Sequence, residues 1–423
     1  MRDVLQPVLA GVVTALVGFA SSFAVVIAGL RAVGATPGQA ASGLLAVCLT
    51  AGVTALWMGL RYRMPISIAW STPGAALLVS TGTMPGGYPV AVGAFLVAAA
   101  LVVVAGLFGP FARWIAAIPT PVASAMLAGV LLDLCLAPVR AVVQTPLLAG
   151  SVILVWALMT RFARKWAVPA ALAVAAVGVV LTRSDTPLDA VGLRPALELT
   201  APAWSVGALV GIALPLFLVT MAAQNVPGMA VMATYGYRPP LRVALLATGV
   251  GSAVGAIFGG HAINLAAISA ALAAGPDAHP DPSRRWIASI TAGLGLATLG
   301  LGAGLATTLV VLAPPVLIEA VAGLALLGAL GAALSAALTS ADALPGWREA
   351  AVVTFVVTGS GTTLAGIGSA FWGLLAGGAL LLLFRFRAPA PGEAPPARDE
   401  ATPAREEPAL ATPTEGSPAP VEP

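Results

Sequence analysis

The chain has 423 residues, of which 59% are hydrophobic and 9% are charged. A soluble domain usually carries about 25% charged residues, so the mean hydropathy of +0.98 excludes an ordinary cytosolic enzyme. The composition predicts an all-α polytopic membrane protein, and the net charge of +3 does not indicate nucleic-acid binding.

Long apolar runs, taken in chain order, predict fourteen transmembrane segments, because each pass needs about 20 apolar residues. The segments lie at 5–30, 39–60, 72–83, 88–110, 120–137, 142–161, 167–182, 205–233, 240–258, 264–274, 286–307, 314–338, 347–361 and 365–385. The stretch 388–423 is rich in Pro, Ala and Glu and holds seven of the seventeen acidic residues. Such a composition cannot bury a core, so we expect a disordered tail there.

Several kinds of chemistry are excluded by what the sequence lacks. The single lysine, Lys165, precedes Trp166, so no phosphate-binding GxxxxGK[ST] loop exists and this chain alone cannot drive transport with ATP. The two histidines, His261 and His279, do not have the spacing of metal ligands. We therefore expect no enzyme activity, no catalytic residues, no metal and no cofactor.

Two of the predicted segments are too short to cross a bilayer. The first follows an extended piece at 65–70, with Thr72 as its N-cap and Pro73 at its first helical position. The second takes Asn264 as its N-cap and stops at a Gly-Pro pair. Each has about ten residues and therefore spans only ~15 Å, half the thickness of a bilayer.

The two short segments lie at matching positions in the two halves of the chain. An offset of 194 residues aligns five identical pairs within twelve positions, namely Pro121 with Pro315, Val122 with Val316, Ala128 with Ala322, Gly129 with Gly323 and Leu132 with Leu326. Seven passes per half is an odd number, so the second half would insert upside down, as in secondary transporters with inverted repeats. Re-entrant packing explains either short segment alone, but the matched pair favours a binding site.

The basic residues predict the orientation of the chain. If the N-terminus is cytoplasmic, fourteen Arg and Lys residues of 1–387 fall inside and only four fall outside. The four are Arg31, Arg140, Arg183 and Arg194. This bias follows the positive-inside rule, so we expect both termini in the cytoplasm.

The N-termini of the two short helices are expected to face each other near the bilayer centre. Each offers unpaired N–H groups and about half a positive charge, which suits an anion. No arginine or lysine lies near them in the apolar depth, so hydroxyl and amide groups would supply the other contacts. The polar candidates are Ser71, Thr72 and Asn264, and the aromatic candidates, which either flank a planar ligand or pack among helices, are Trp70, Phe19 and Phe23.

The eighth segment carries two consecutive amides, Gln224 and Asn225, close to Pro227. Two amides at membrane depth are costly unless they find partners, and the proline frees a backbone carbonyl nearby. An interhelical hydrogen bond explains many single amides, whereas the pair favours contact with a ligand.

Three ionisable side chains lie at membrane depth or at a helix break: Asp133, Glu319 and His261. Such groups are functional hypotheses by default, so all three are candidates for carrying a coupled proton. Each also has a simpler explanation. The negative charge of Glu319 interacts favourably with the N-terminus of its own helix. Asp133 lies near the outer interface, and His261 forms a hydrogen bond with a freed backbone carbonyl.

The chain resembles the benzoate:proton symporter family of bacteria at two motifs and in the Pro65–Gly74 stretch. The motifs are Gln224-Asn225-Val226-Pro227-Gly228 and Gly259-Gly260-His261-Ala262-Ile263-Asn264-Leu265. The similarity extends over 1–387, and the family in turn resembles the uracil permeases and other nucleobase and anion transporters. These stretches place Gly74 and Ile263 among the candidates for substrate binding.

The resemblance implies a fold of fourteen segments in a seven-plus-seven inverted repeat, with short strands before half-helices three and ten. It implies a core domain that moves against a gate domain, and it implies a homodimer. The core consists of 1–110 and 201–310, and the gate consists of 111–200 and 311–387.

The sequence departs from the uracil permeases at two positions. Those proteins carry an acidic residue in the eighth segment, where this chain has Gln224, and another near the tenth segment, where Asn264 and its neighbours are neutral. This departure argues against nucleobase recognition and suits a ligand that brings its own negative charge.

The sequence thus predicts a secondary transporter of the bacterial cytoplasmic membrane. It would import an aromatic carboxylate such as benzoate together with a proton, by an elevator-type alternating-access mechanism. Two alternatives stay open. One is a transporter of another small anion or of a nucleobase, and the other is a channel or a receptor that moves no substrate.

Overall fold

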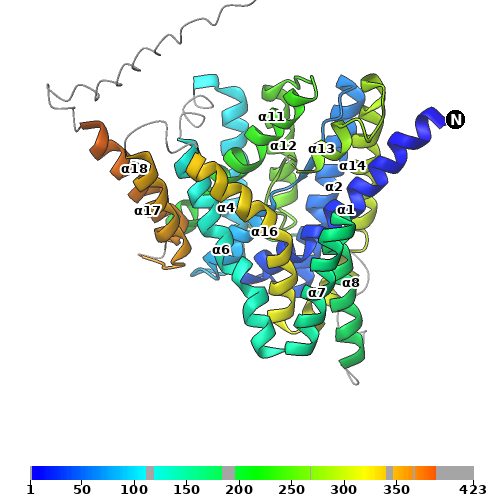
Figure 1. Ribbon diagram of the computed structural model, residues 1–423. Coiled ribbons are helices and arrows are strands. Elements are labelled where there is room, and N and C mark those ends of the chain that lie inside the picture. Colours follow the sequence, from blue (N-terminus) through cyan, green and yellow to red (C-terminus); the bar gives the residue numbers. More distant parts are fainter. Residues whose placement is uncertain are drawn as a thin grey trace, which may run out of the picture. The chain divides into compact units, whose positions relative to one another are not determined.

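The computed structural model describes residues 2–110, 119–182, 196–266, 268–339, 346–364 and 367–386. Each of the fourteen predicted segments contains a helix, and two short strands precede the third and the tenth (Figure 1). One compact unit comprises Met1–Phe384. The predicted tail, 388–423, lies outside the described residues.

The first half of the chain contains α1 (Arg2–Ala32), α2 (Pro37–Tyr62), β1 (Ile68–Trp70), α3 (Thr72–Thr81), α4 (Tyr88–Leu107), α6 (Thr120–Gln144), α7 (Pro146–Phe162), η1 (Arg164–Trp166) and α8 (Ala167–Thr182). The eighth segment is one continuous helix made of α9 (Val206–Ala208), η3 (Leu209–Ala213), α10 (Leu214–Thr220), η4 (Met221–Asn225) and α11 (Val226–Thr234). In this helix η3 and η4 are single stretches of π-helix. The chain continues with α12 (Leu241–Ala256), β2 (Ile263–Leu265), α13 (Ile268–Ala274), η5 (Pro282–Arg284), α14 (Trp286–Gly300), α15 (Ala303–Leu312), α16 (Pro315–Thr339), α17 (Trp347–Gly359) and α18 (Ser369–Phe386).

The helices make this a multi-span membrane protein. By length and composition, six of the described helices can each cross a bilayer: α1, α2, α4, α6, the continuous α9–α11 helix and α16. The bent pair α14–α15 adds a seventh span if it is counted as one. Other helices, such as α7 and α12, are apolar but shorter. The number of fourteen spans therefore stays a prediction.

Three local predictions are wrong. The residue that caps α3 is Ser71, not Thr72, and its hydroxyl accepts from the Gly74 N–H at 3.1 Å. Asn264 is not an N-cap, because it lies inside β2. The predicted helix 286–307 is two helices bent by 58°, with the break after Gly300, where the backbone lies so close to α2 that a Cβ would overlap Cys48.

One predicted boundary also moves. The helix predicted to end at 137 continues to Gln144, with Pro138 inside α6. A proline removes one hydrogen bond from a helix but does not always end it in a membrane, where neighbouring groups compensate.

The two strands form an antiparallel ribbon inside the bundle. Ile68 pairs with Leu265, Ala69 with Asn264 and Trp70 with Ile263. The ladder is extended at both ends by backbone bonds of 2.9 Å, from Ala266 to Ser67 and from Ser71 to Ala262. Because the strands are antiparallel, α3 and α13 leave the ribbon at opposite ends.

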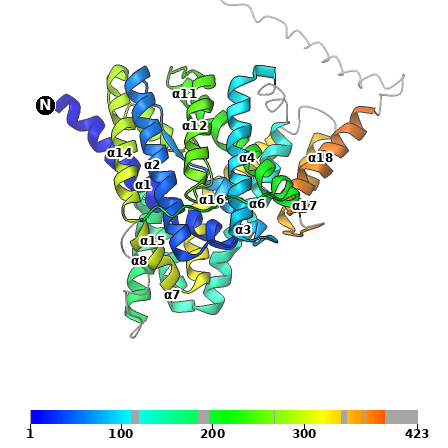
Figure 2. The same ribbon diagram turned by 180° about the vertical axis from the view of Figure 1, so that it is seen from behind.

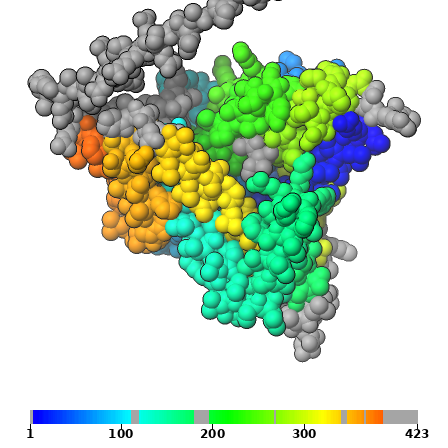
Figure 3. Space-filling model, viewed as in Figure 1, coloured from blue at the N-terminus to red at the C-terminus, as the bar shows by residue number. Residues whose placement is uncertain are grey.

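The helices pack in two groups. In the first, α14 packs against α1 and α2, α12 packs against α4, and α3 packs against α1. In the second, α6 packs along α16 and α17, and α7 packs on α8. Figures 1 and 2 show α16 crossing close to both α6 and α1, and in the space-filling view α16 (yellow) lies against α6 and α7 (Figure 3). The helix α16 therefore lies where the two groups meet.

Small residues bring these helices into backbone contact, as is usual in membrane proteins. A Cβ added at Gly29 of α1 would overlap the carbonyl oxygen of Ala75 in α3. A Cβ at Gly323 of α16 would overlap the carbonyl oxygen of Leu134 in α6. Within each group, glycine is therefore required at the points of closest approach.

We expect Gly323→Ala to lower the stability of the protein by about 1–3 kcal/mol, because the added methyl group forces α6 and α16 apart. Gly328→Ala is the matched control on the same helix, since a Cβ there meets nothing within 4 Å. Thermal unfolding of the purified protein in detergent measures the difference. Equal unfolding midpoints for the two variants would show that α6 and α16 are not in close contact.

Candidate functional site

A central cavity of about 150 Å³ lies between the strand ribbon, α1, α14 and α16. Its lining comprises Thr14, Ala15, Val17, Gly18, Ser21 and Ser22 of α1; Ser67, Ile68, Ala69, Trp70, Thr72 and Pro73 around β1; Gln224; Ala266, Ser269 and Leu272 around α13; Ser289, Ala292, Gly293 and Leu296 of α14; and Ala325, Leu326 and Ala329 of α16. Most of these side chains are apolar or small, and the polar ones are neutral. An apolar cavity of roughly 150 Å³ in another protein holds a benzene molecule, so one aromatic ring matches this volume.

Trp70 presents its ring to the cavity and its indole N–H to the protein. The indole Nε1 donates to the Ser22 hydroxyl at 3.0 Å, and the residue is 3% exposed. Phe19 packs edge-on against the indole at 5.9 Å between ring centroids, and Phe23 stacks on Phe19 at 5.1 Å. Of the three predicted aromatic residues, only Trp70 lines the cavity, and the two phenylalanines form a row behind it.

The N-terminus of α3 offers less hydrogen-bonding capacity than the sequence indicates. The Ser71 hydroxyl accepts from the Gly74 N–H at 3.1 Å, and Pro73 has no N–H. The Ala75 N–H already donates to the Ser71 carbonyl at 2.8 Å. In the part of the chain that the structure describes, the Thr72 N–H is therefore the one left for a ligand, together with the positive end of the helix dipole.

The predicted amides divide into two kinds. Gln224 lines the cavity and is 8% exposed. Asn225, which is fully buried, accepts from the Leu265 N–H at 3.0 Å and donates to the Met221 sulfur at 3.3 Å. Consecutive residues on a helix point in different directions, so one amide faces the cavity and the next one holds β2 in place.

Asn264 also serves the ribbon. In the orientation that pairs both of its amide atoms, its oxygen accepts from the Ser71 N–H at 3.1 Å and its nitrogen donates to the Leu265 carbonyl at 2.9 Å. The residue is fully buried and does not line the cavity. Ile263, Ser71 and Gly74 also lie behind the cavity wall, in β2 and at the start of α3.

Two of the three candidates for proton coupling, Asp133 of α6 and Glu319 of α16, lie close enough to interact electrostatically, and His261 lies on a different element. His261 is fully buried, and its Nε2 lies 3.0 Å from the Ser71 carbonyl oxygen. Because that oxygen only accepts, Nε2 carries the hydrogen, and Nδ1 has no partner among the described residues. Glu319 lines a different cavity, of about 350 Å³, together with Arg31, and Asp133 pairs with Arg140 at 2.8 Å.

Sequence reasoning missed most of the hydroxyl groups in the lining. Ser67, Ser269 and Ser289 lie on three different elements, and nothing in the sequence places them together. The contribution of α1 left a readable signal, because positions 14, 18, 21 and 22 follow the spacing of one helix face. That face carries Thr14, Gly18, Ser21 and Ser22, which are small or hydroxylated in an otherwise apolar helix.

A groove continues from the cavity along the N-terminal part of α1. It has a volume of about 390 Å³ and shares Thr14 and Leu272 with the cavity lining. Lys165 of η1 and Asp277, which follows α13, also line it, and their charged atoms lie 3.7 Å apart. The two residues belong to different helix groups, so this ion pair bridges them.

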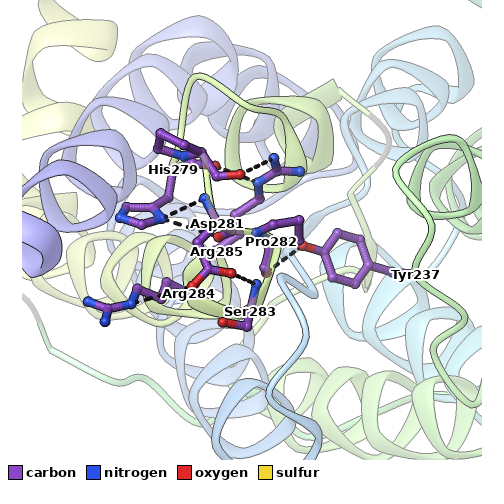
Figure 4. Close-up of polar contacts among 8 residues, drawn as sticks. Tyr237, His279, Asp281, Pro282, Ser283, Arg284 and Arg285 are labelled. Atoms are coloured by element: carbon purple, nitrogen blue, oxygen red, sulfur yellow. Dashed lines mark hydrogen bonds and ion pairs between the residues drawn. The ribbon is translucent and has the colours of Figure 1, made fainter.

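The loop that carries Asp277 is fixed by Arg285, which is 7% exposed (Figure 4). Its guanidinium donates to the carbonyl oxygens of Ala274 at 2.9 Å, His279 at 2.7 Å and Pro280 at 3.3 Å. Ala274 is the last residue of α13, so the positive charge of Arg285 also interacts favourably with the negative end of the helix dipole.

Nearby side chains complete this loop. The Tyr237 hydroxyl donates to the Pro282 carbonyl at 2.7 Å, and the Ser283 N–H donates to the Asp281 carboxylate at 2.8 Å (Figure 4). Hydrogen bonds from the side chain and backbone of Ser283 hold the pKa of Asp281 below its usual value. The loop thus keeps α13 in position at the end of the groove.

The chain matches the family described as benzoate membrane transport protein over residues 4–383. It is 42% identical over 371 residues to the inner membrane protein YdcO of Escherichia coli (strain K12), covering 88% of this chain and 93% of that protein. It is 32% identical over 383 residues to the benzoate membrane transport protein of Acinetobacter baylyi, with the same two coverages.

Two solved structures share the fold at 14% sequence identity. The transmembrane domain of a cyanobacterium bicarbonate transporter, BicA, superposes with a TM-score of 0.60 and covers 89% of this chain and 98% of that one. Murine Solute Carrier 26 family member A9, an anion transporter solved in the inward-facing state, gives a TM-score of 0.60 over 90% of this chain and 68% of that one. The fold is therefore that of known membrane transporters, while the expected relation to the uracil permeases stays a prediction.

We expect Asn225→Ala to destabilise the protein by about 1–3 kcal/mol, because it leaves the buried Leu265 N–H without its acceptor. Gln224→Ala, one residue earlier, shortens a side chain of the cavity wall and is expected to cost less. Thermal unfolding in detergent compares the two. If Asn225→Ala unfolds at the wild-type temperature, the amide does not support the strand ribbon.

Proposed function

The chain belongs to the benzoate membrane transport protein family, and on this basis we propose that it imports an aromatic carboxylate such as benzoate together with protons. The relatives and the shared fold make it a membrane transporter. By analogy with its bacterial relatives, we place it in the cytoplasmic membrane, with both termini inside.

The cavity is the observation that carries this proposal. Its volume of about 150 Å³ suits one aromatic ring, and Trp70 supplies an aromatic wall. Its lining also includes Thr72 at the start of α3, whose N–H is a suitable donor for a carboxylate, and the polar side chain of Gln224. An aromatic carboxylate has both parts, a planar apolar ring and an anionic group.

The lining has no charged side chain among the described residues. An anion in this site is therefore stabilised by N–H groups, hydroxyl groups and the dipole of α3. A neutral site also avoids the cost of burying a permanent cation when the site is empty. This arrangement suits a transporter whose substrate and proton bind and leave together.

His261 is the best placed of the three candidates to link the proton to the anion. Its Nε2 donates to the carbonyl of Ser71, the residue that caps α3, and Nδ1 is the basic atom that remains. A proton on Nδ1 would add a positive charge beside the helix start that receives the carboxylate. Proton and anion would then favour each other's binding, as thermodynamic linkage requires. Glu319 and Asp133 stay as alternative carriers.

We propose an elevator-type movement of a core domain (α1–α4 and α9–α15) against a gate domain (α6–α8 and α16–α18). The cavity is walled by both groups, since α1, β1 and α14 form one side and Ala325 and Ala329 of α16 form the other. Small apolar side chains on α16 make a smooth surface for sliding. The inverted repeat and fourteen spans that the family resemblance implies belong to the same proposal.

We further infer that the structure represents an inward-facing state. The groove next to the cavity is lined by Lys165 and Asp277, in loops that the positive-inside rule places in the cytoplasm. Arg31 and Glu319, which that rule places near the outer side, line the separate cavity. The Lys165–Asp277 ion pair then joins core and gate on the cytoplasmic side.

Uptake of labelled benzoate into proteoliposomes tests the function. With an imposed inward proton gradient, we expect accumulation above equilibrium that a protonophore abolishes and that uracil does not reduce. Protein-free liposomes at the same pH are the control, because benzoic acid crosses bilayers unaided. Uptake equal to that control would exclude benzoate as the substrate, and competition by bicarbonate would point to another small anion.

His261→Gln in the same assay tests the proton carrier. It is expected to abolish accumulation driven by the proton gradient while benzoate exchange without a gradient persists. Wild-type coupling in this variant would transfer the role to Glu319 or Asp133. Flux that never accumulates benzoate above equilibrium in the wild-type protein would favour a channel, and binding without any flux would favour a receptor.

Cross-linking tests the movement. Lys165→Cys combined with Asp277→Cys places two thiols where the ion pair joins the helix groups, and a bifunctional maleimide with a cleavable linker is expected to stop uptake reversibly. The single-cysteine variants are the controls, and the native Cys48 and Cys135 are buried. Cross-linked protein that transports at the normal rate would rule out a relative movement of core and gate at this point.

A further inference from the structure

We propose that Gly18 determines the size of the aromatic ring that the cavity accepts. This inference rests on the proposed function and deepens it, since it identifies which part of the site receives the ring and which residue limits it.

Gly18 occupies the interior of α1, where glycine is unfavourable by roughly 1 kcal/mol relative to alanine. Close packing explains the other glycines of this helix. A Cβ at Gly11 would overlap the carbonyl oxygen of Ala288, and one at Gly29 would overlap that of Ala75. A Cβ at Gly18 would meet nothing within 4 Å, so packing gives no reason for glycine at this position.

The space beside Gly18 belongs to the central cavity. Gly293 also lines this cavity, but a Cβ there would approach the Ala55 side chain to 2.8 Å, so packing of α14 on α2 explains that glycine. Of the two glycines that line the cavity within the described residues, Gly18 is the one that no packing contact explains. The absence of a side chain there only enlarges the cavity. This is the expected feature of a position that leaves room for a ligand.

Hydrogen bonds fix the position of Gly18 relative to Trp70. The hydroxyls of Ser21 and Ser22 donate to the Gly18 carbonyl at 2.9 and 3.1 Å. The Ser22 hydroxyl also accepts from the Trp70 indole at 3.0 Å. The open position at Gly18 and the indole ring are therefore held together as two parts of one wall.

The same bonds determine the chemistry of that wall. Because Ser21, Ser22 and Trp70 direct their hydrogens to protein acceptors, this side of the cavity offers no spare donor for a carboxylate. The groups suited to an anion are the Thr72 N–H at the start of α3 and the Ser67 hydroxyl, which has no partner among the described residues. The wall at Gly18 therefore suits the apolar ring of the substrate, and its carboxylate lies toward α3.

Substitution at Gly18 tests the assignment in the purified full-length protein. Benzoate binding, measured by calorimetry in detergent, is expected to weaken about tenfold for Gly18→Ala and further for Gly18→Val, as overpacking a filled cavity does. Binding of 4-methylbenzoate should weaken more than that of benzoate, since the larger ring needs more of the space. Gly328→Ala is the control, because its Cβ also meets nothing within 4 Å but does not line this cavity.

A labelling measurement keeps the proposal testable if the larger variant does not fold. Cys48 and Cys135 are buried, so a thiol introduced as Gly18→Cys can be modified selectively by a water-soluble methanethiosulfonate. Benzoate at ten times its dissociation constant is expected to slow this labelling about tenfold, since roughly nine sites in ten are then occupied. Labelling of Gly328→Cys should not respond to benzoate.

The outcomes separate this inference from the proposed function. Wild-type affinity for both benzoates in Gly18→Ala and Gly18→Val, or labelling of Gly18→Cys that benzoate does not slow, overturns the role of Gly18 and leaves benzoate transport standing. Wild-type protein that binds no benzoate overturns the proposed substrate, and the ring assignment fails with it. Weaker binding in the Gly18 variants alone supports both.

Discussion

The structure depends on one constraint, which is the need to pair backbone polar groups where the chain is not helical inside a membrane protein. The two strands meet part of this need by pairing with each other. Among the described residues no third strand pairs with the outer edge of β2, and side chains replace it. Ser252 of α12 accepts from the Ile263 N–H at 2.9 Å, and Asn225 accepts from the Leu265 N–H. Only with this edge satisfied can two short helices start from a ribbon in the interior of the bundle.

The ribbon in turn creates the site. Helices that cross a membrane leave little space between them, because small residues let their backbones touch. Between α2 and α3 the chain forms the strand β1, which is narrower than a helix. A cavity therefore remains between the ribbon, α1 and α16. The cavity wall and the structural support of the ribbon therefore use adjacent residues of one helix, Gln224 for the first and Asn225 for the second.

The sequence was informative where a residue type has one physical role. Hydropathy located the helices, and the Pro and Gly residues around Trp70 and after Gly260 located both breaks, which the structure confirms as strands followed by short helices. It was less informative about side-chain direction. Asn264 and Asn225 were predicted to contact a ligand, yet they bond to backbone groups, because a buried amide is equally suited to either partner. Trp70, Thr72 and Gln224 do line the cavity, but their contact with substrate stays a prediction.

The two π-helical turns of the eighth segment have an evolutionary consequence. A π turn holds one residue more than an α turn, so it corresponds to a single inserted residue within a continuous helix. Deleting one residue from η4 would restore regular winding and leave the flanking parts of the helix facing the same way, because the wider turn absorbs the extra residue. A one-codon deletion there would change which side chain of the turn faces the cavity, where Gln224 now lies, while the flanking turns keep their contacts. Descendants of this chain therefore have a short mutational route to a different ligand.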